Sequence, residues 1–508
     1  MKRRAFLGST ILGLSATTLV PARASAPEFS RNPFTLGVAS GDVTDNSAVL
    51  WTRLAPEPLQ ADGGMDSSGV LVNWEIALDP AMSRIVQRGE SVASSELAHS
   101  VHVELENLNA NQEYWYRFST TSQHSQIGRT KTLPDTKSQL QSLRFVTASC
   151  QNYSHGYFVA YEHMVKDKPD FVIHLGDYIY DTSFGATFRK HETEKRPETL
   201  DEFRRRHALY KTDEHLQHAH AQIPFFTTID NHDAIEDKDP DKAAQRIAAY
   251  QAWYEHMPVR GFVGPGANRF DLLRKIQLGN LAQISLLDAR QFRDKKDLCR
   301  DSMDSKFGFG NYRERCKEII KDERSMLGKE QESWLINNLQ NNSTSWNVIA
   351  SPGPFLPFHF QHGGKDLRYI GAWDAYPANR KRIAEVVAQS SSGHPLILSG
   401  DVHSFWALDG SLTRDPDERI PVVEFVTSSI SANWPEPLNK PVMDNLNNNP
   451  QVKFYEGERR GYLLHEVNKT EWKTTARAMQ DVKDNQSRAF DAANFLVRKG
   501  ESGFTQTS

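Results

Sequence analysis

The sequence predicts an α/β protein built from layered β-sheets flanked by helices, preceded by a smaller all-β domain. Three observations lead to this prediction. The chain has 508 residues, more than the roughly 250 to 300 that one hydrophobic core usually holds, so two domains are expected. Residues 34–133 carry short alternating apolar runs without a helical period. From residue 143 onward, apolar strands alternate with helical segments, which indicates sheets covered by helices.

Residues 1–26 have the pattern of an export signal. Lys2, Arg3 and Arg4 precede an apolar stretch from Phe6 to Val20, and alanines follow at alternate positions up to residue 26. The arginine pair resembles the signal read by the twin-arginine export machinery, which carries folded proteins; an ordinary leader with two arginines is the alternative. Because the stretch is too short to cross about 30 Å of hydrocarbon, we expect a periplasmic or secreted protein without a transmembrane anchor.

The first domain, residues 31–135, is predicted to be an immunoglobulin- or fibronectin-like β-sandwich. Its apolar runs alternate with polar residues and are separated by Gly, Asn, Asp and Pro, which is typical of half-buried strands joined by turns. The clearest runs are Ala48–Arg53, Val70–Ala77, Val101–Leu105 and Glu113–Phe118. A polar linker over residues 134–141 separates this domain from the next.

The second domain, residues 141–500, is predicted to be the catalytic α/β domain. The expected strands are Leu143–Ala148, Phe171–Leu175, Pro224–Ile229, Ala282–Leu287, Trp346–Ala350, Leu396–Leu398 and Val422–Val426. Helices are expected near Gly156–Asp167, Leu200–Lys211, Lys242–His256, Lys329–Asn338 and Asn379–Gln389. Near the C-terminus we expect antiparallel strands at Gly461–Val467 and Trp472–Met479, followed by a short helix at Ser487–Phe495.

Charge and cysteine content exclude several classes of protein. Sixty Lys plus Arg against 64 Asp plus Glu give a net charge of −4, too balanced for binding that rests on neutralising phosphates, so no stable nucleic-acid partner is expected. Three cysteines cannot form a disulfide framework. Cys299 and Cys316 can close one loop, whereas Cys150, at a strand end, is either a packing residue or a ligand or nucleophile.

Chemically reactive side chains follow four of the predicted strands. Cys150 follows the first, Asp177 the second and Asp230-Asn-His-Asp the third, and Asp401 and His403 follow a later one. The carboxyl ends of strands in α/β folds converge on ligands, so these side chains are expected to meet in one site. Residues two apart at a strand end project to the same side, which favours a dinuclear metal centre. A helix cap for each Asp and an ordinary polar contact for each His are the alternatives.

Longer motifs around these residues resemble one family. They are Val38-Ala-Ser-Gly-Asp-Val, Val49-Leu-Trp-Thr-Arg, Gly176-Asp-Tyr-Ile-Tyr, Tyr250-Gln-Ala-Trp-Tyr-Glu-His-Met-Pro, Gly371-Ala-Trp-Asp-Ala-Tyr, Leu398-Ser-Gly-Asp-Val-His-Ser-Phe-Trp and Glu424-Phe-Val-Thr-Ser-Ser-Ile-Ser. Together they resemble the PhoD-like family of alkaline phosphatases and phosphodiesterases, relatives of the calcineurin-like metallophosphoesterases. The resemblance implies the metallophosphoesterase fold, a layered sandwich of two sheets flanked by helices.

The resemblance also implies a ligand set. It places a ferric ion (Fe³⁺) on Cys150, Asp177, Tyr180 and His403, with Asp177 bridging to calcium (Ca²⁺), whose oxygen donors would be Asn231 and Asp401. A trivalent ion suits a phenolate ligand, because a phenol with an ordinary pKa of about 10 ionises only beside a strong Lewis acid. One departure concerns a second calcium: many relatives read Asp-Asp-His-Glu where this chain has Asp230-Asn-His-Asp, followed by Glu236 and Asp237.

The implied function is a metal-dependent alkaline phosphatase and phosphodiesterase that scavenges phosphate. A metal-activated oxygen nucleophile would attack phosphorus in line, with Asp177 and Asp401 in the centre and His232 contacting the phosphate or the leaving group. Arg246 and Trp373 are predicted to bind substrate, with a solvated helix face and core packing as their alternatives. We expect a monomer acting on small phosphate esters. The alternatives are a phospholipase D-like or nucleotide phosphodiesterase with the same centre, and a non-catalytic binding protein.

Overall fold

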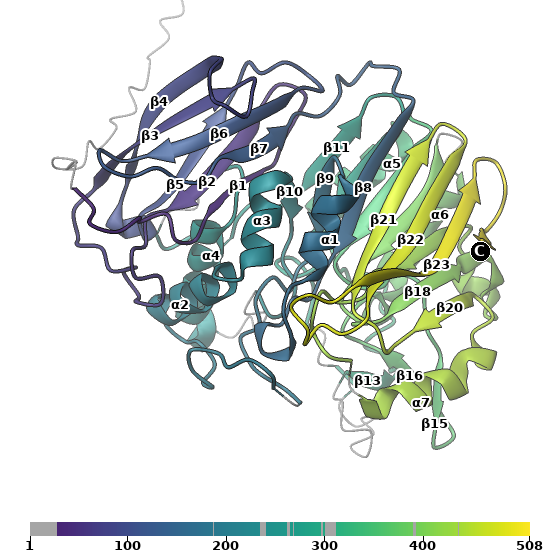
Figure 1. Ribbon diagram of the computed structural model, residues 1–508. Helices are drawn as coiled ribbons and strands as arrows, with labels where there is room; N and C mark the ends of the chain where they lie inside the picture. The colour runs from purple at the N-terminus through teal and green to yellow at the C-terminus, as the bar shows by residue number, and fades with distance from the viewer. Residues whose placement is uncertain are drawn as a thin grey trace, which may run out of the picture.

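The computed structural model describes residues 28–185, 187–233, 240–261, 265–267, 269–295, 298–299, 311–389, 393–434 and 436–507. Two large sheets face each other, and helices cover their outer faces (Figure 1). The predicted export signal over residues 1–26 lies outside the described residues, as do Glu236 and Asp237. Within the described part of the chain, no helix has the length and apolar character needed to cross a membrane.

The first large sheet has ten strands. They are β1 (Val38–Gly41), β2 (Ala48–Arg53), β5 (Ser100–Leu105), β8 (Ser142–Ala148), β9 (Phe171–His174), β10 (Phe225–Thr227), β21 (Gly461–Asn468), β22 (Glu471–Met479), β23 (Ala489–Arg498) and β24 (Thr505–Thr507). Their order across the sheet is β24-β23-β22-β21-β8-β9-β10-β1-β2-β5. Strands β8, β9, β10 and β1 run parallel to one another, so the carboxyl ends of β8, β9 and β10 share one edge.

The second large sheet has seven strands. They are β11 (Arg274–Leu278), β12 (Ala282–Leu286), β14 (Trp346–Ser351), β17 (His394–Ser399), β18 (Phe405–Asp409), β19 (Val423–Val426) and β20 (Val452–Glu456). A three-stranded sheet is formed by β13 (Tyr312–Glu314), β15 (Phe360–His362) and β16 (Lys365–Tyr369). Strands β12, β14, β17 and β19 are parallel, which brings their carboxyl ends to a common edge as well.

Seven α-helices occur in the described residues. They are α1 (Ala160–Asp167), α2 (Leu200–Lys211), α3 (Glu214–Gln222), α4 (Ala243–His256), α5 (Gly328–Gln340), α6 (Pro377–Gln389) and α7 (Glu436–Asn445). Helices α1 and α3 share one core with the outer face of β8 and β9, and α5 and α6 share another with β14 and β17. The layers are therefore helix, sheet, sheet, helix, which confirms the predicted fold class.

Neighbouring side chains of an interior strand point to opposite faces of the sheet, and both faces are buried. This explains why these strands are continuous apolar runs in the sequence. Phe145 on β8 points between the two sheets and packs on Phe171, whereas Val146 points toward the helices. Both faces of the strand are buried, so alternation in the sequence disappears. The two sheets contact each other through aromatic pairs such as Trp346 and Trp472, whose ring centroids are 5.7 Å apart.

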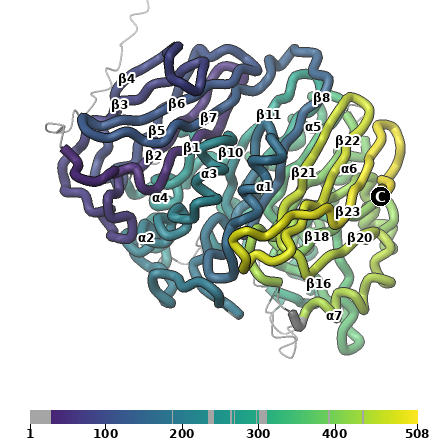
Figure 2. The backbone as a smooth tube through the Cα atoms, in the orientation of Figure 1, coloured from purple at the N-terminus to yellow at the C-terminus, as the bar shows by residue number. Residues whose placement is uncertain are grey.

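The N-terminal strands form a small sandwich. Its second sheet comprises β3 (Val70–Ala77), β4 (Ile85–Ala93), β6 (Glu113–Ser119) and β7 (Gly128–Lys131), packed over β1, β2 and β5. Strand β1 also pairs with β10, Gly41 opposite Phe225, so one sheet of the sandwich continues into the large sheet. Figure 2 shows the sandwich at one end of the molecule and the C-terminal strands at the other. The predicted boundaries at residues 31–135 and 141–500 remain predictions.

The helix predicted at Ser487–Phe495 is wrong. These residues enter β23, which pairs with β22 along its whole length and with β24 on its other side. Strand preference depends mainly on cross-strand partners and burial. The side chains of Ala493, Phe495 and Val497 all point into the core between the sheets, and this burial decides for the strand.

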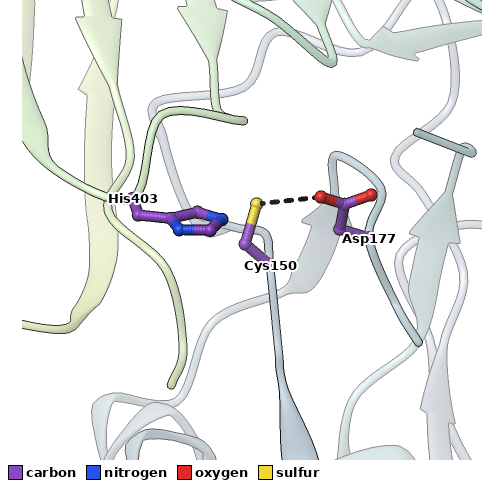
Figure 3. A group of neighbouring side chains, drawn as sticks. All are labelled: Cys150, Asp177 and His403. Atoms are coloured by element: carbon purple, nitrogen blue, oxygen red, sulfur yellow. Dashed lines mark hydrogen bonds between the residues drawn. The ribbon is translucent and has the colours of Figure 1, made fainter. Parts of the chain in front are cut away.

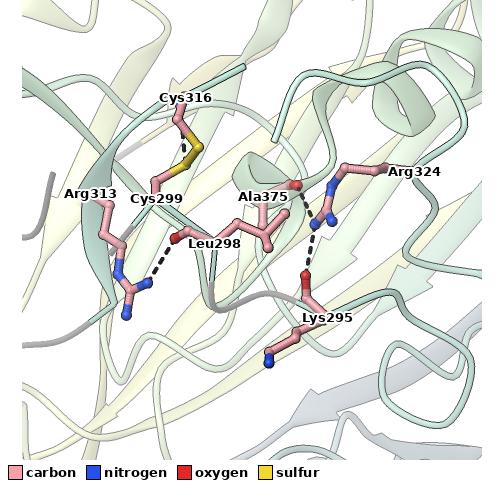
Figure 4. The surroundings of a disulfide bond; sticks show 7 residues. All are labelled: Lys295, Leu298, Cys299, Arg313, Cys316, Arg324 and Ala375. Carbon is pink, nitrogen blue, oxygen red and sulfur yellow. Dashed lines mark hydrogen bonds between the residues drawn. A yellow bond between two sulfur atoms is a disulfide. The ribbon is translucent and has the colours of Figure 1, made fainter. Parts of the chain in front are cut away.

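The structure decides whether Cys299 and Cys316 are paired, which the sequence left open. The two residues form a disulfide with a Cα–Cα distance of 5.5 Å across 17 positions. The bond lies beside Arg313, whose Nη1 donates to the Leu298 carbonyl at 2.8 Å (Figure 4). Cys150 is a free, buried thiol.

Candidate metal centre

The candidate site lies where the carboxyl ends of the two sheets meet. Cys150, Asp177 and Asp230 follow β8, β9 and β10 of the first sheet, and Asp401 follows β17 of the second. The Thr427 hydroxyl donates to the carbonyl of Thr147 at 3.2 Å and so ties the two edges together. Parallel strands therefore bring residues more than 250 positions apart to one place.

The backbone at this edge is held in an unusual conformation. Cys150, Asp177, Asp401 and His403 all have positive φ, between 49° and 73°. Such values cost a non-glycine residue of the order of 1 kcal/mol and concentrate at functional sites. Gly176 has φ 103°, and a Cβ there would lie 2.6 Å from the backbone nitrogen of Asp230, so only glycine fits.

A first group of ligand-competent side chains comprises Cys150, Asp177 and His403. Their ligand atoms lie within 4.8 Å of one another. The Cys150 thiol donates to Asp177 Oδ2 at 3.7 Å, and the His403 ring lies on the other side of the sulfur (Figure 3). Tyr180 joins the group through its hydroxyl, 2.8 Å from His403 Nε2. His403 is oriented by its Nδ1, which lies 2.8 Å from the Asn433 carbonyl.

A second group comprises the carboxylates of Asp177, Asp230 and Asp401, whose ligand atoms also lie within 4.8 Å of one another. Asp177 belongs to both groups, as expected for a carboxylate that bridges two ions. Asn231 lies at the rim, with its Oδ1 3.4 Å from Arg290 Nη2. The Arg290 guanidinium pairs with Asp230, and its Nη2 lies 3.9 Å from Asp401 Oδ1.

Burial makes anionic forms of these side chains costly. It raises the pKa of the Cys150 thiol, and the neighbouring Asp177 carboxylate raises it further. Burial likewise raises the pKa of the Tyr180 phenol, and it raises that of Asp177 to about 6. It lowers the pKa of His403 to about 3, so the imidazole is neutral and able to donate an electron pair. A buried set of thiol, phenol, imidazole and carboxylates fits a cation, which offsets the desolvation of the anions.

His232 lies beside both groups without belonging to either. Its Nδ1 is 2.7 Å from Asp181 Oδ1, its ring packs on Tyr180 at 4.2 Å between centroids, and its backbone N–H donates to Asp177 Oδ1 at 2.9 Å. Burial opposes the charged form, but Asp177 and the Asp181 bond outweigh it and raise the pKa of His232 to about 9. The ring is thus held at the edge of the centre with Nε2 directed away from Asp181.

Asp233 explains how the loop after β9 keeps its shape. Its Oδ1 accepts hydrogen bonds from the backbone N–H groups of Tyr178 and Ile179, at 2.8 and 3.1 Å. Its Oδ2 accepts from the N–H of Asp230 at 3.0 Å. One buried carboxylate therefore braces the loops that carry Asp177 and Asp230 against each other.

The two residues predicted to bind substrate occupy different kinds of position in the structure. Arg246 lies on α4, and its role toward phosphate stays a prediction. Trp373 is fully buried, and its indole N–H donates to the Ser351 hydroxyl at 3.0 Å, which contradicts substrate binding and agrees with the core-packing alternative. Trp373 packs on Phe355 instead.

Sequence reasoning gave no role in the site to Asp181 or Arg290, and it included Asp230 among the strand-end residues without naming it as a ligand. Asp230 directly precedes the predicted ligand Asn231 and follows β10, so its position could have identified it as an oxygen donor. Asp181 and Arg290 carry no local signal, because each acts on a residue at least 51 positions away.

Most of the chain is similar to known phosphatases. A family model described as PhoD-like phosphatase matches residues 145–476, and one described as PhoD-like phosphatase, N-terminal domain, matches residues 20–134. Alkaline phosphatase D of Bacillus subtilis (strain 168) is 38% identical over 502 residues, 95% of this chain and 84% of that protein. A solved structure described as "Structure of PhoD" has a TM-score of 0.87 at 37% identity, covering 95% of this chain and 94% of that one.

Proposed function

Because the chain belongs to the PhoD-like phosphatase family and is a phosphoric ester hydrolase, we propose that it hydrolyses phosphate mono- and diesters at a centre holding one ferric ion and calcium. The observation that carries this proposal is the position of Asp177. Its carboxylate belongs both to the thiol and imidazole group and to the group of carboxylates. Softer sulfur and nitrogen donors on one side and hard oxygens on the other suit two different cations.

Cys150, Asp177, Tyr180 and His403 would hold the ferric ion. Asp177 and Asp401 would hold calcium, with Asn231 and Asp230 as further oxygen donors. When bound, the cations supply Lewis-acid charge that stabilises the phosphoryl oxygens and makes a water nucleophilic at neutral pH.

The protein's own contribution is to place the groups that act around phosphorus. Asp181 accepts from His232 Nδ1, which leaves Nε2 to contact the phosphate or to donate a proton to the leaving oxygen. The Tyr369 hydroxyl donates to Asp401 Oδ2 at 2.8 Å and fixes that carboxylate. No serine or threonine nucleophile is required, since water attacks in line.

The cellular setting belongs to the same proposal. The twin arginines of the leader and the thiol ligand support export in the folded state, because a centre assembled before export protects Cys150 from pairing with Cys299 or Cys316. We expect a monomeric enzyme in the periplasm or outside the cell that releases phosphate for uptake.

Metal analysis and a two-substrate assay test the proposal. The purified enzyme should contain iron and calcium and should hydrolyse p-nitrophenyl phosphate and its bis ester. Tyr180→Phe should weaken a visible phenolate-to-iron absorption band, whereas Tyr161→Phe, a buried tyrosine bonded to Gln151 outside the centre, should leave the band unchanged. Asp401→Ala and Asp177→Ala should abolish hydrolysis. A colourless zinc enzyme of full activity would refute the ferric assignment.

A further inference from the structure

A small cavity lies against the proposed metal centre. It has a volume of about 60 Å³, and its walls include the side chains of Tyr312, Phe358, Tyr369, Trp406, Trp434 and Val442. That volume exceeds the roughly 10–15 Å³ that one water needs and is well below the roughly 150 Å³ of a cavity that takes a benzene ring. The cavity is thus large enough for a short alkyl group and too small for a whole aromatic ring.

Two walls of the cavity are connected to predicted metal ligands. The Tyr369 hydroxyl donates to Asp401 Oδ2 at 2.8 Å, and Val402, which also lines the cavity, follows Asp401 in the chain. Trp434 follows Asn433, whose carbonyl lies 2.8 Å from His403 Nδ1. A group seated in the cavity therefore lies next to the loops that present Asp401 and His403.

The cavity is open to a ligand rather than a packing defect of the core. Phe358, Tyr369, Val402 and Trp434 are all partly exposed. The buried indole N–H of Trp434 has no hydrogen-bond partner among the described residues. It needs an acceptor other than the alkyl group, such as a water.

The charges around the cavity favour an uncharged occupant. Asp374 is the one carboxylate among the described lining residues. It already accepts from Arg380 Nη1 at 2.7 Å and lies 3.4 Å from Arg315 Nη2. Because two guanidinium groups neutralise it, the lining offers a ligand no free charge, and burial of apolar surface is the main contribution that an occupant can gain.

We propose that this cavity binds a short, uncharged alkyl portion of the leaving alcohol of a phosphate ester. The inference rests on the proposed function, since it places the alkyl group beside the phosphate held at the metal centre. Binding of the alkyl group in the cavity makes the enzyme selective among alkyl esters by the length of the chain next to the ester oxygen.

A homologous series of monoalkyl phosphates, from methyl to hexyl, tests the proposal on the metal-loaded enzyme. Release of inorganic phosphate gives kcat/KM for each ester. Each methylene that enters the cavity should raise kcat/KM about fourfold, and the rise should stop once the cavity is full. A series without any rise would overturn the inference, while hydrolysis of methyl phosphate would still support the proposed function.

Variants at Val442 on α7 locate the effect. Val442→Leu should narrow the cavity and make the series stop rising at a shorter chain. Val442→Ala should enlarge the cavity and move the optimum to a longer chain, which also serves if Val442→Leu fails to fold. A chain-length profile that neither variant changes would refute this location.

A pair of isosteric esters tests the charge argument. Choline phosphate and 3,3-dimethylbutyl phosphate have the same shape, but only the first carries a quaternary ammonium. The enzyme should favour the uncharged ester. A preference for choline phosphate would contradict the assignment of an apolar occupant.

Discussion

Replacing Arg290 by methionine should destabilise the metal-free protein severely. Arg290 is 3% exposed, and its guanidinium pairs with Asp230, which is 1% exposed. The guanidinium also donates to the Gly371 carbonyl at 3.2 Å and lies 3.9 Å from Asp401 Oδ1. Methionine would leave the Asp230 carboxylate buried without its charged partner, which costs about 3–5 kcal/mol.

Arg293→Met provides the matched control. Arg293 is 4% exposed and donates to the same Gly371 carbonyl at 3.0 Å. Because the structure gives Arg293 no contact with Asp401 among the described residues, added calcium should restore less stability to Arg293→Met than to Arg290→Met.

Urea unfolding, followed by tryptophan fluorescence after treatment with a chelator, measures both variants. Added calcium should restore more stability to Arg290→Met than to the unaltered protein, because the variant has one more uncompensated negative charge at the site. At 100 times the dissociation constant, the gain from binding is about 2.7 kcal/mol. Equal recovery in the two variants, or no recovery with calcium, would refute the pairing of Arg290 with Asp230.

Three further changes test other parts of the structure. Burial alone raises the pKa of Glu418, but a histidine hydrogen bond and three arginines outweigh it and hold that pKa well below its ordinary range. The carboxylate therefore stabilises the protein above about pH 4.3. Glu418→Gln should lose most stability near pH 7 and progressively less toward pH 3, and a gap that widens in acid would contradict this. Replacing Cys299 and Cys316 by serine should lower the free energy of unfolding by about 3 kcal/mol, measurable by urea denaturation and absent if the wild-type disulfide is first reduced. Gly176→Ala should lower both thermal stability and bound calcium, because the new Cβ would lie 2.6 Å from Asp230; unchanged metal content would argue against a shared loop geometry.

Elements with strong local signals could be predicted from the sequence. The helix predicted at Leu200–Lys211 has the same bounds in the structure, because Thr199 and Glu202 form a capping box at its start. The interior strands were recognisable from their apolar runs, since both of their faces are buried. Ser487–Phe495 had no such signal, and its pairing with β22 was decided by contacts beyond the segment.

The residues of the candidate site also fall into those that the sequence could identify and those that it could not. The sequence could identify four residues as candidates because each follows a strand: Cys150, Asp177, Asp401 and His403. It could not identify Arg290 as the partner of Asp230, because 60 positions separate the pair. It also could not decide between substrate binding and core packing for Trp373, because an aromatic residue in a glycine-rich loop fits either role.

The sequence alone determined many of the strands and helices and the chemical type of the groups at the strand ends, because periodicity, caps and turns depend on neighbouring residues. Only the tertiary structure decided which loops meet, how Asp177 comes to be shared by two groups of ligands, and where a cavity opens beside them. These properties depend on distances between segments remote in the chain, and packing of the two sheets fixes those distances.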